Sequence, residues 1–279
     1  DNKKKPSTNA KRRNLMRIII PIKQVPETSN VKMDPETGTM VREGVESIIN
    51  PLDLYSIETG IRLKEKYGGE IIVVSMGPKK AEEALKEAIA MGCDDGVLLT
   101  DRFFAGSDTF ATSYTISKAI EKLKPFDLIL CGERATDGDT AQVGPGIASL
   151  LGLPLSTFTS KVEVEDGHIK ANRLIEGGYE VLNLPMPALV TVVKEIADPR
   201  LPTLTGKLKA KKLEIKQWTA KEIEADPENL GLKGSPTRVV KTFSPKVARE
   251  GKVIEVKEEK SLNQAEDEII ELLKEKAVI

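Results

Sequence analysis

The chain has little histidine or cysteine and no long apolar run. Its 279 residues include one histidine, His168, and two cysteines, Cys93 and Cys131. A single imidazole removes most of the reactions that need this group, among Ser-His-Asp hydrolysis, histidine-rich metal sites and histidine acid/base pairs. The cysteines are too few and too unpatterned for a disulfide framework or a zinc ribbon, and they indicate a reducing compartment. No apolar run approaches the roughly 20 residues of a membrane-spanning helix. The function classes that remain are binding proteins and proteins that carry a cofactor.

An excess of one charge sign is also missing. The 42 basic and 43 acidic residues give a net charge of -1, so the overall field that draws a protein onto nucleic acid is absent. Apolar residues make up 39% of the chain, which at this length is enough for a core without disulfides or a structural metal. We expect a cytoplasmic protein of one large or two small domains that is not itself transmembrane.

Short apolar runs alternate with helical patterns after residue 15. Residues 1–15 are polar and basic, and we expect a disordered tail or an expression remnant there. Runs typical of strands buried on both faces of a parallel sheet are 17–22, 71–75, 97–100 and 127–131. The helices expected after them, the first capped by Asn50, are 51–67, 80–91, 108–124 and 141–152. This alternation predicts a doubly wound, mostly parallel, Rossmann-like α/β domain over residues 16–197.

The pattern changes after Pro154. Residues 162–170 read as a β-hairpin that turns at Asp166-Gly167, and 188–193 as one more strand. From Asp198 onward no sustained core pattern is present until a terminal helix at 264–276. We therefore expect residues 198–279 to be an extended arm that packs on a partner subunit.

The clearest candidate for ligand chemistry is the segment from Gly132 to Pro145. It leads from a strand into a helix, where unpaired backbone N–H groups bind anions in parallel α/β sheets. The N–H groups of Ala141, Gln142, Val143 and Gly144 can point at a phosphate, and Gly144 has no Cβ to obstruct it. The segment lacks the lysine of a P-loop, which argues against nucleotide hydrolysis. The alternative is that Asp137 and Asp139 only cap a helix.

Three other strand ends carry weaker signals. In the segment 103–113, Gly106 permits a tight turn before Asp108, Thr109 and Thr112, but a helix cap with aromatic core residues explains these residues equally simply. Met76 in the turn after the second strand is typical of a core residue. Lys23 after the first strand is interpreted as a solvated charge, and His168 beside its hairpin turn as exposed and inert.

Taken together, these segments resemble the β subunit of electron transfer flavoproteins from about Met16 to Ile279. Six separated motifs in the same order carry the resemblance: 21–26, 49–51, 75–78, 90–92, 132–144, and 198–200 running into 210–212. The resemblance implies an α subunit as partner and a buried adenine nucleotide. Its adenine and ribose side would be Pro21, Asn50, Val73, Ser75 and Met76. Its phosphate side would be Asp139, Ala141, Gln142, Val143 and Gly144. Further cofactor-binding candidates in the same segment are Gly132, Asp137 and Thr140.

The resemblance is greatest to the electron-bifurcating branch, through the segments 104–109, 138–145 and 234–237. It implies FAD in this chain, with NADH as transient hydride donor. Electrons would divide between a high-potential acceptor, on a quinone or acyl-CoA dehydrogenase side, and a ferredoxin-like protein. Residues that would give the flavin room and polar contacts are Phe104, Gly106, Asp108, Thr109, Thr112 and Arg134. The alternative is a non-bifurcating β subunit that holds structural AMP and passes electrons from dehydrogenases to a quinone reductase.

The resemblance also implies a recognition loop that docks on partner dehydrogenases or a quinone oxidoreductase through Leu204. Any contact with a membrane would come through those partners. Two other classes fit the sequence less well. An adenine-nucleotide sensor does not predict the long arm after Asp198, and an ATP-pyrophosphatase-like ligase needs a Ser/Gly-rich loop after the first strand. We expect an electron carrier rather than an independent enzyme.

Overall fold

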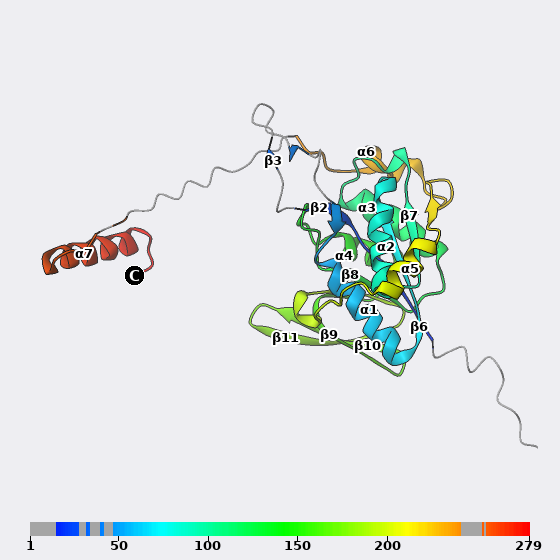
Figure 1. Ribbon diagram of the computed structural model, residues 1–279, viewed down its shortest axis with the longest axis horizontal. Helices are drawn as coiled ribbons and strands as arrows, with labels where there is room; N and C mark the ends of the chain where they lie inside the picture. Colours follow the sequence, from blue (N-terminus) through cyan, green and yellow to red (C-terminus); the bar gives the residue numbers. More distant parts are fainter. Residues whose placement is uncertain (1–14, 28–31, 34–39, 42–46, 241–252, 254) are drawn as a thin grey trace, which may run out of the picture. The chain divides into compact units, whose positions relative to one another are not determined.

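The computed structural model of the chain describes residues 15–27, 32–33, 40–41, 47–240, 253 and 255–279 (Figure 1). The chain divides into one unit that ends at Lys241 and a second that begins at Thr242. A nine-stranded sheet forms the first unit, in the order β11-β10-β9-β12-β8-β1-β6-β7-β13. Its strands are β1 (Met16–Pro21), β6 (Gly69–Met76), β7 (Asp95–Leu99), β8 (Leu128–Gly132), β9 (Leu155–Glu165), β10 (His168–Ile175), β11 (Gly178–Pro185), β12 (Ala188–Val192) and β13 (Lys216–Trp218). Two small ladders join β2 (Gln24–Pro26) to β5 (Ser47–Ile49) and β3 (Lys32–Met33) to β4 (Met40–Val41).

The order of the strands creates a switch point between β1 and β8. From β1 the chain moves outward through β6 to β7, each parallel to the one before, and then returns to the other side of β1 as β8. Ligands of open parallel sheets bind at such a point, outside the carboxyl ends of the two strands. The doubly wound, mostly parallel α/β fold predicted from the sequence is confirmed.

Helices cover both faces of the sheet. One apolar cluster packs α1 (Asp53–Tyr67), α2 (Glu82–Met91) and α5 (Leu204–Lys212) on one face, and a second packs α3 (Thr109–Lys122) and α4 (Val143–Leu151) on the other. Ile18, Ile19 and Ile20 of β1 have no exposed surface, because both faces of this strand are covered. Each such side chain stabilises the fold by about 1.5–3 kcal/mol. The remaining helices are η3 (Lys79–Ala81), η4 (Arg102–Phe104), η5 (Lys194–Ile196), η6 (Pro227–Asn229), α6 (Gly231–Gly234) and α7 (Glu259–Glu275).

The predicted hairpin is part of a larger antiparallel ribbon. β9 and β10 extend well beyond residues 162–170, and β11 adds a third strand at the edge of the sheet. β11 escaped prediction because its first four residues are all exposed, so its sequence lacks the alternation of a half-buried strand. The structure also corrects the predicted cap of the first helix. Leu52 is the N-cap of α1, and the Asn50 side chain bonds elsewhere.

The segment after Asp198 differs from its predicted role as an arm. Up to residue 234 it packs on the sheet's own helices and edge, where α5 lies against α2 and β13 pairs with β7. Its buried apolar residues are Ala210, Ile215, Ala220, Ile223 and Leu230. They are widely spaced among lysines and glutamates, so the sequence shows no periodic core pattern. Packing on a partner subunit stays a prediction for the residues beyond 241.

The described part of the second unit is mostly α7, which begins five residues before the predicted helix 264–276. Glu258 and Ser261 form a capping box at its start. Leu262, Ile269, Ile270 and Leu272 are exposed on this helix. Among the described residues of both units, no helix combines the length and apolar character needed to cross a membrane.

Candidate functional site

The loop between β8 and α4 carries a run of unused backbone donors at the switch point. Within the described part of the chain, the N–H groups of residues 140–144 donate no hydrogen bond, whereas Gly146 donates to the carbonyl of Gln142 and closes the first turn of α4. These groups lie at a helix N-terminus, where the helix dipole adds partial positive charge. Residues 139, 140 and 142 are exposed. The loop can therefore bind a diphosphate through its main chain.

Two residues of this loop adopt a backbone conformation that side chains disfavour. Asp139 and Ala141 have φ angles of 53° and 54°, in the left-handed region. Non-glycine residues there cost roughly 1–3 kcal/mol and persist where their surroundings hold them. The left-handed Ala141 is followed by the right-handed Gln142, and such a pair of conformations is typical of anion-binding nests.

Side chains from distant parts of the chain hold this loop in place. The buried Asn50 amide donates to the carbonyl of Arg134 at 2.9 Å and accepts from the N–H of Thr136 at 3.1 Å. Lys23, interpreted from sequence as a solvated charge, pairs with Asp137 at 2.7 Å. Arg134 pairs with Asp139 at 2.7 Å and with Glu133 at 2.8 Å. Asn50 thus supports the loop through both ends of its amide.

A buried carboxylate that sequence reasoning missed joins the two strands of the switch point. Asp53, the first residue of α1, accepts from the N–H of Lys23 at 2.7 Å, and the backbone of Gly132 also bonds to it. A Cβ on Gly132 would lie 2.4 Å from Asp53 Oδ1. Burial, only partly offset by these bonds, raises the pKa of Asp53 to about 7. The only sequence signal was a carboxylate near the start of a helix, which usually serves the helix dipole.

Gly144 is required for packing rather than for approach of a phosphate. A Cβ at this position would lie 2.7 Å from Thr191 Cγ2 and 3.7 Å from Cys131 Cβ. The glycine therefore lets the first turn of α4 lie directly on β12 and β8. Its N–H remains among the unused donors, but the proposed reason for its missing side chain is corrected.

The residues predicted for the adenine and ribose side lie at or near the carboxyl ends of β1 and β6. Pro21 and Met76 are the last residues of these strands. Val73 and Ser75 have no exposed surface, and Val73 packs in the apolar cluster beneath α1 and α2. Within the described residues, Ser75 Oγ has no hydrogen-bond partner. A buried hydroxyl without a partner costs roughly 1–3 kcal/mol, and a polar ligand atom would relieve that cost.

The segment from Phe104 to Thr112 lies beside the phosphate loop, but most of its polar groups are already used. Ser113 Oγ donates to the carbonyl of Val143 at 3.2 Å and joins the starts of α3 and α4. Asp108 Oδ1 accepts from the N–H groups of Phe110 and Ala111, and Oδ2 accepts from the N–H and hydroxyl of Thr237. The interpretation of Asp108 as a helix cap is therefore confirmed.

The other residues of this segment differ in how far they remain accessible. Phe104 is buried, and Leu232 covers Gly106. Within the described chain, the half-buried hydroxyls of Thr109 and Thr112 make no hydrogen bond. They are the groups of this segment still available to a ligand.

Leu204 lies far along the surface from these loops, as the first residue of α5. It is 77% exposed, and the Thr203 side chain caps the helix by accepting from the N–H of Gly206 at 2.9 Å. Leu201 is 84% exposed in the same segment. The predicted recognition leucine is thus part of an exposed apolar pair.

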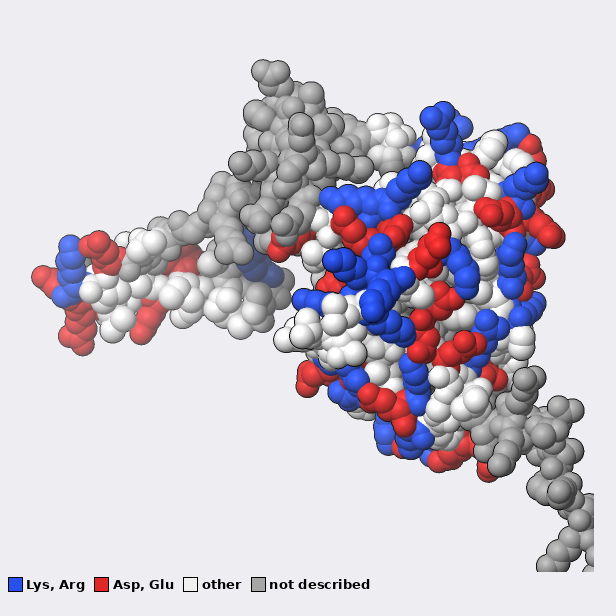
Figure 2. Space-filling view, turned by 45° about the vertical axis from the view of Figure 1, so that its right-hand side comes forward, with Lys and Arg blue, Asp and Glu red and all other residues white. Residues whose placement is uncertain are grey.

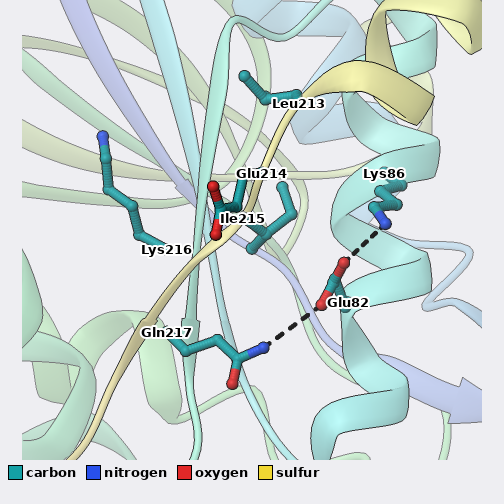
Figure 3. Close-up of a pocket in the computed structure, with 7 residues that line it drawn as sticks. All are labelled: Glu82, Lys86, Leu213, Glu214, Ile215, Lys216 and Gln217. Carbon is teal, nitrogen blue, oxygen red and sulfur yellow. Dashed lines mark hydrogen bonds and ion pairs between the residues drawn. The ribbon is translucent and has the colours of Figure 1, made fainter.

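Other features of the surface give no competing site. A hollow of about 640 Å³ lies between α2 and β13, where Glu82 contacts Lys86 and Gln217 (Figure 3), and it shares no residue with the predicted nucleotide set. Basic and acidic side chains are interspersed over the face shown in Figure 2. In the described ranges no group of histidine, cysteine, aspartate and glutamate could hold a metal ion. Cys93 and Cys131 are buried, and burial raises the pKa of both thiols.

Comparison with known proteins agrees with this arrangement. The electron transfer flavoprotein domain family matches residues 37–223. A β subunit of electron transfer flavoprotein from Thermoanaerobacterium thermosaccharolyticum is 48% identical over 265 residues, 95% of this chain and all of the relative. The caffeyl-CoA reductase-Etf complex subunit CarD of Acetobacterium woodii is 44% identical over 95% of this chain and all of the relative. The protein FixA of Azotobacter vinelandii is 41% identical over 92% of this chain and 94% of the relative.

These matches cover the switch point, the loop between β8 and α4, and the segment with Leu204. Because the family match spans more than half of the chain and the relatives align along nearly all of it, the chain belongs to the electron transfer flavoprotein family, among its β subunits.

Proposed function

We propose that this chain binds FAD at the carboxyl ends of β1 and β8 and carries electrons in a complex with an α subunit. The observation that carries the proposal is the run of N–H groups at residues 140–144, which donate no hydrogen bond to any described residue. A monophosphate needs only part of such a run, whereas a dinucleotide places two linked phosphates along it. The orphaned hydroxyl of Ser75 supports a polar ligand at the neighbouring strand end.

The finer part of the proposal is electron bifurcation with NADH as donor. Bound FAD supplies hydride and single-electron transfer, and the protein supplies binding, shielding and electrostatics. In this chain the phosphate loop anchors the nucleotide, and the hydroxyls of Thr109 and Thr112 are placed to contact a group that extends beyond the diphosphate. Arg134 is held by Glu133 and Asp139 and keeps positive charge beside the loop. The acceptors would be a quinone-linked or acyl-CoA-linked partner and a ferredoxin-like protein.

A non-bifurcating subunit with structural AMP is the second candidate, and a specific observation favours it. Asp108 uses both carboxylate oxygens within the protein and Leu232 covers Gly106, so neither residue offers a free group to a flavin. AMP would occupy the phosphate loop and the strand ends without reaching that segment.

The nucleotide content of the complex decides between them. The chain is co-expressed with its α subunit, the purified complex is denatured, and the released nucleotides are identified and counted. Two FAD per heterodimer is the expected result. One FAD and one AMP would establish the second candidate, and a complex with no nucleotide in the β subunit would overturn both.

We also propose that Leu204 docks on partner dehydrogenases and that the complex is cytoplasmic. The exposure of Leu204 beside Leu201 supports the docking role, since exposed apolar side chains on an ordered segment suit a transient contact. The location is supported by two free buried cysteines. Replacing Leu204 by Ala should weaken transfer to a dehydrogenase without changing nucleotide content.

A further inference from the structure

Glu58 is a charged residue buried between α1 and the segment that carries Leu204. Its side chain is 3% exposed. It accepts from the backbone N–H of Arg200 at 3.2 Å, from Arg200 Nε at 2.8 Å and Nη2 at 3.1 Å, and from Arg62 Nε at 2.7 Å. Burial alone would raise the pKa of Glu58, but these bonds outweigh it and hold the pKa below its usual range. A buried carboxylate with this many partners is costly to leave without them.

Arg200 reaches a second carboxylate two turns further along α1. Its Nη1 and Nη2 donate to Glu65 at 2.6 and 3.0 Å, so one guanidinium spans two carboxylates of the same helix. Arg62 also donates to the carbonyl of Asp198 at 3.4 Å. The start of the segment is therefore fixed to α1 at Asp198 and at Arg200.

The other end of the segment is fixed to α2. The N–H of Thr203 donates to the carbonyl of Ala90 at 3.2 Å, and a Cβ on Gly206 would lie 2.0 Å from the same oxygen. Lys209 donates to the carbonyl of Cys93 at 3.0 Å. Leu201 and Leu204 lie between these two attachments and are the most exposed leucines of the described chain.

We propose that Glu58 is a positioning residue that, through Arg200, holds residues 198–204 in one conformation and presents Leu201 and Leu204 together to a partner. The inference rests on the proposed docking role of Leu204. Rigid presentation lowers the ordering entropy lost on binding, which matters for a contact that is small and transient. Lys207, Lys211 and Lys212 follow on α5, so the matching partner surface is an apolar pocket with carboxylates at its rim.

The test compares Glu58→Gln with Glu65→Gln in the complex with the α subunit. Both glutamates bond Arg200, but Glu58 is buried and Glu65 is exposed, so the second variant is a matched control. We expect amide hydrogen exchange over residues 198–206 to rise about tenfold in Glu58→Gln and about twofold or less in Glu65→Gln, with β1 unchanged. Unchanged exchange in the segment, or an equal rise throughout the chain, would overturn the proposal.

A kinetic measurement separates positioning from docking. With an acyl-CoA dehydrogenase active on butyryl-CoA as the probe, Glu58→Gln should raise the apparent KM for the dehydrogenase about fivefold and leave kcat within about twofold. Arg200→Lys keeps the charge but loses the fork, and should behave like Glu58→Gln. Leu204→Ala is measured in parallel. If it leaves KM unchanged, the docking role fails, and exchange alone decides the positioning. Leu204→Ala could instead raise KM while Glu58→Gln increases amide exchange without raising KM. That result would overturn the positioning role of Glu58 and leave the docking role of Leu204 standing.

Discussion

The loops that follow β7 and β8 are similar in composition but use their polar groups in opposite ways. Each leads from a buried parallel strand into a helix and contains one glycine and two aspartates together with threonine. After β7, Asp101 bonds the N–H groups of Phe103 and Ala220, and Asp108 bonds the start of α3 and Thr237. After β8, Asp137 and Asp139 pair with Lys23 and Arg134, and the N–H groups of residues 140–144 donate to no residue that the structure describes.

The difference shows that hydrogen-bond accounting separates a helix cap from a ligand loop when composition does not. A loop whose carboxylates satisfy its own helix N-terminus has fewer backbone donors left for an anion. In the loop after β8 the carboxylates of Asp137 and Asp139 pair with Lys23 and Arg134 instead, and the N-terminus of α4 remains available to a ligand. The following variants test this division of roles, beginning with the largest expected effect.

Gly144→Val should empty the nucleotide site of this chain while the α subunit keeps its flavin. The new side chain meets Thr191 at the point where α4 rests on β12, which forces the start of α4 and its N–H groups away from the sheet. We also expect a loss of stability of about 1–3 kcal/mol from overpacking. Released nucleotide and the unfolding free energy are both measured.

Gly138→Ala is the control, because a Cβ there meets nothing within 4 Å. It should keep full occupancy. Full occupancy in Gly144→Val would show that the loop does not hold the nucleotide through α4.

Asp53→Asn should remove a dependence of stability on pH. Because burial raises the pKa of Asp53 to about 7, the folded protein holds a proton that the unfolded chain releases above about pH 4. The contribution of Asp53 is therefore fully present below about pH 4 and is lost as pH rises to about 7. Relative to wild type, the variant should gain up to about 1.4 kcal/mol per pH unit across this window.

Asp108→Asn sharpens the contrast between the loops because the contribution of Asp108 to stability depends on pH in the opposite direction to that of Asp53. Despite some burial, bonds from Ala111, Thr237 and Phe110 hold the pKa of Asp108 below its usual range. Its contribution is present above about pH 4 and is lost as pH falls through its lowered pKa. Denaturant unfolding between pH 3 and pH 8 gives both variants on one scale. Parallel stability curves for Asp53→Asn and wild type would contradict the buried-proton explanation.

The fold was predictable where burial leaves a local pattern. β1, β6, β7 and β8 are covered on both faces, so their sequences are continuous apolar runs, and glycines mark the ends of α1, α2 and α4. β13 has three residues, all at least partly exposed, and its pairing with β7 leaves no such trace. The lysine-rich sequence of α5 likewise hides the one buried alanine that packs it against α2.

The position of the candidate site was predictable from the sequence, but the contacts that hold its loop were not. A strand-to-helix loop with glycines and aspartates predicts where an anion would bind. The contacts of Asn50 with Arg134, of Lys23 with Asp137 and of Asp53 with Lys23 join residues 84, 114 and 30 positions apart. These contacts form because the sheet places β1 beside β8, and no local sequence pattern indicates the order of the strands. The same limit explains why Asp108 and Thr237 could not be paired from sequence.

Asn50→Ala should weaken nucleotide binding about tenfold without emptying the site. It leaves the carbonyl of Arg134 and the N–H of Thr136 without their buried partner, which costs roughly 1–3 kcal/mol and loosens the loop after β8. Titration of the nucleotide-depleted complex measures the change. Asn183→Ala on the exposed edge strand β11 is the control and should bind as wild type does. Equal affinity for both variants would mean that the loop needs no support from Asn50.

Thr112→Val is the smallest expected effect and returns to the first turn of α3, which follows the loop after β7. Its hydroxyl makes no hydrogen bond within the described chain, so the substitution conserves shape and costs the fold little. If FAD occupies the site, loss of one neutral hydrogen bond should weaken it about fivefold. If AMP occupies it, Thr112→Val should bind as wild type does, because AMP ends before this segment. The measurement is a separate titration of FAD and of AMP onto nucleotide-depleted wild-type and variant complexes. Its result shows whether the region after β7 keeps a polar group for the ligand or uses all of its polar groups for its own helix.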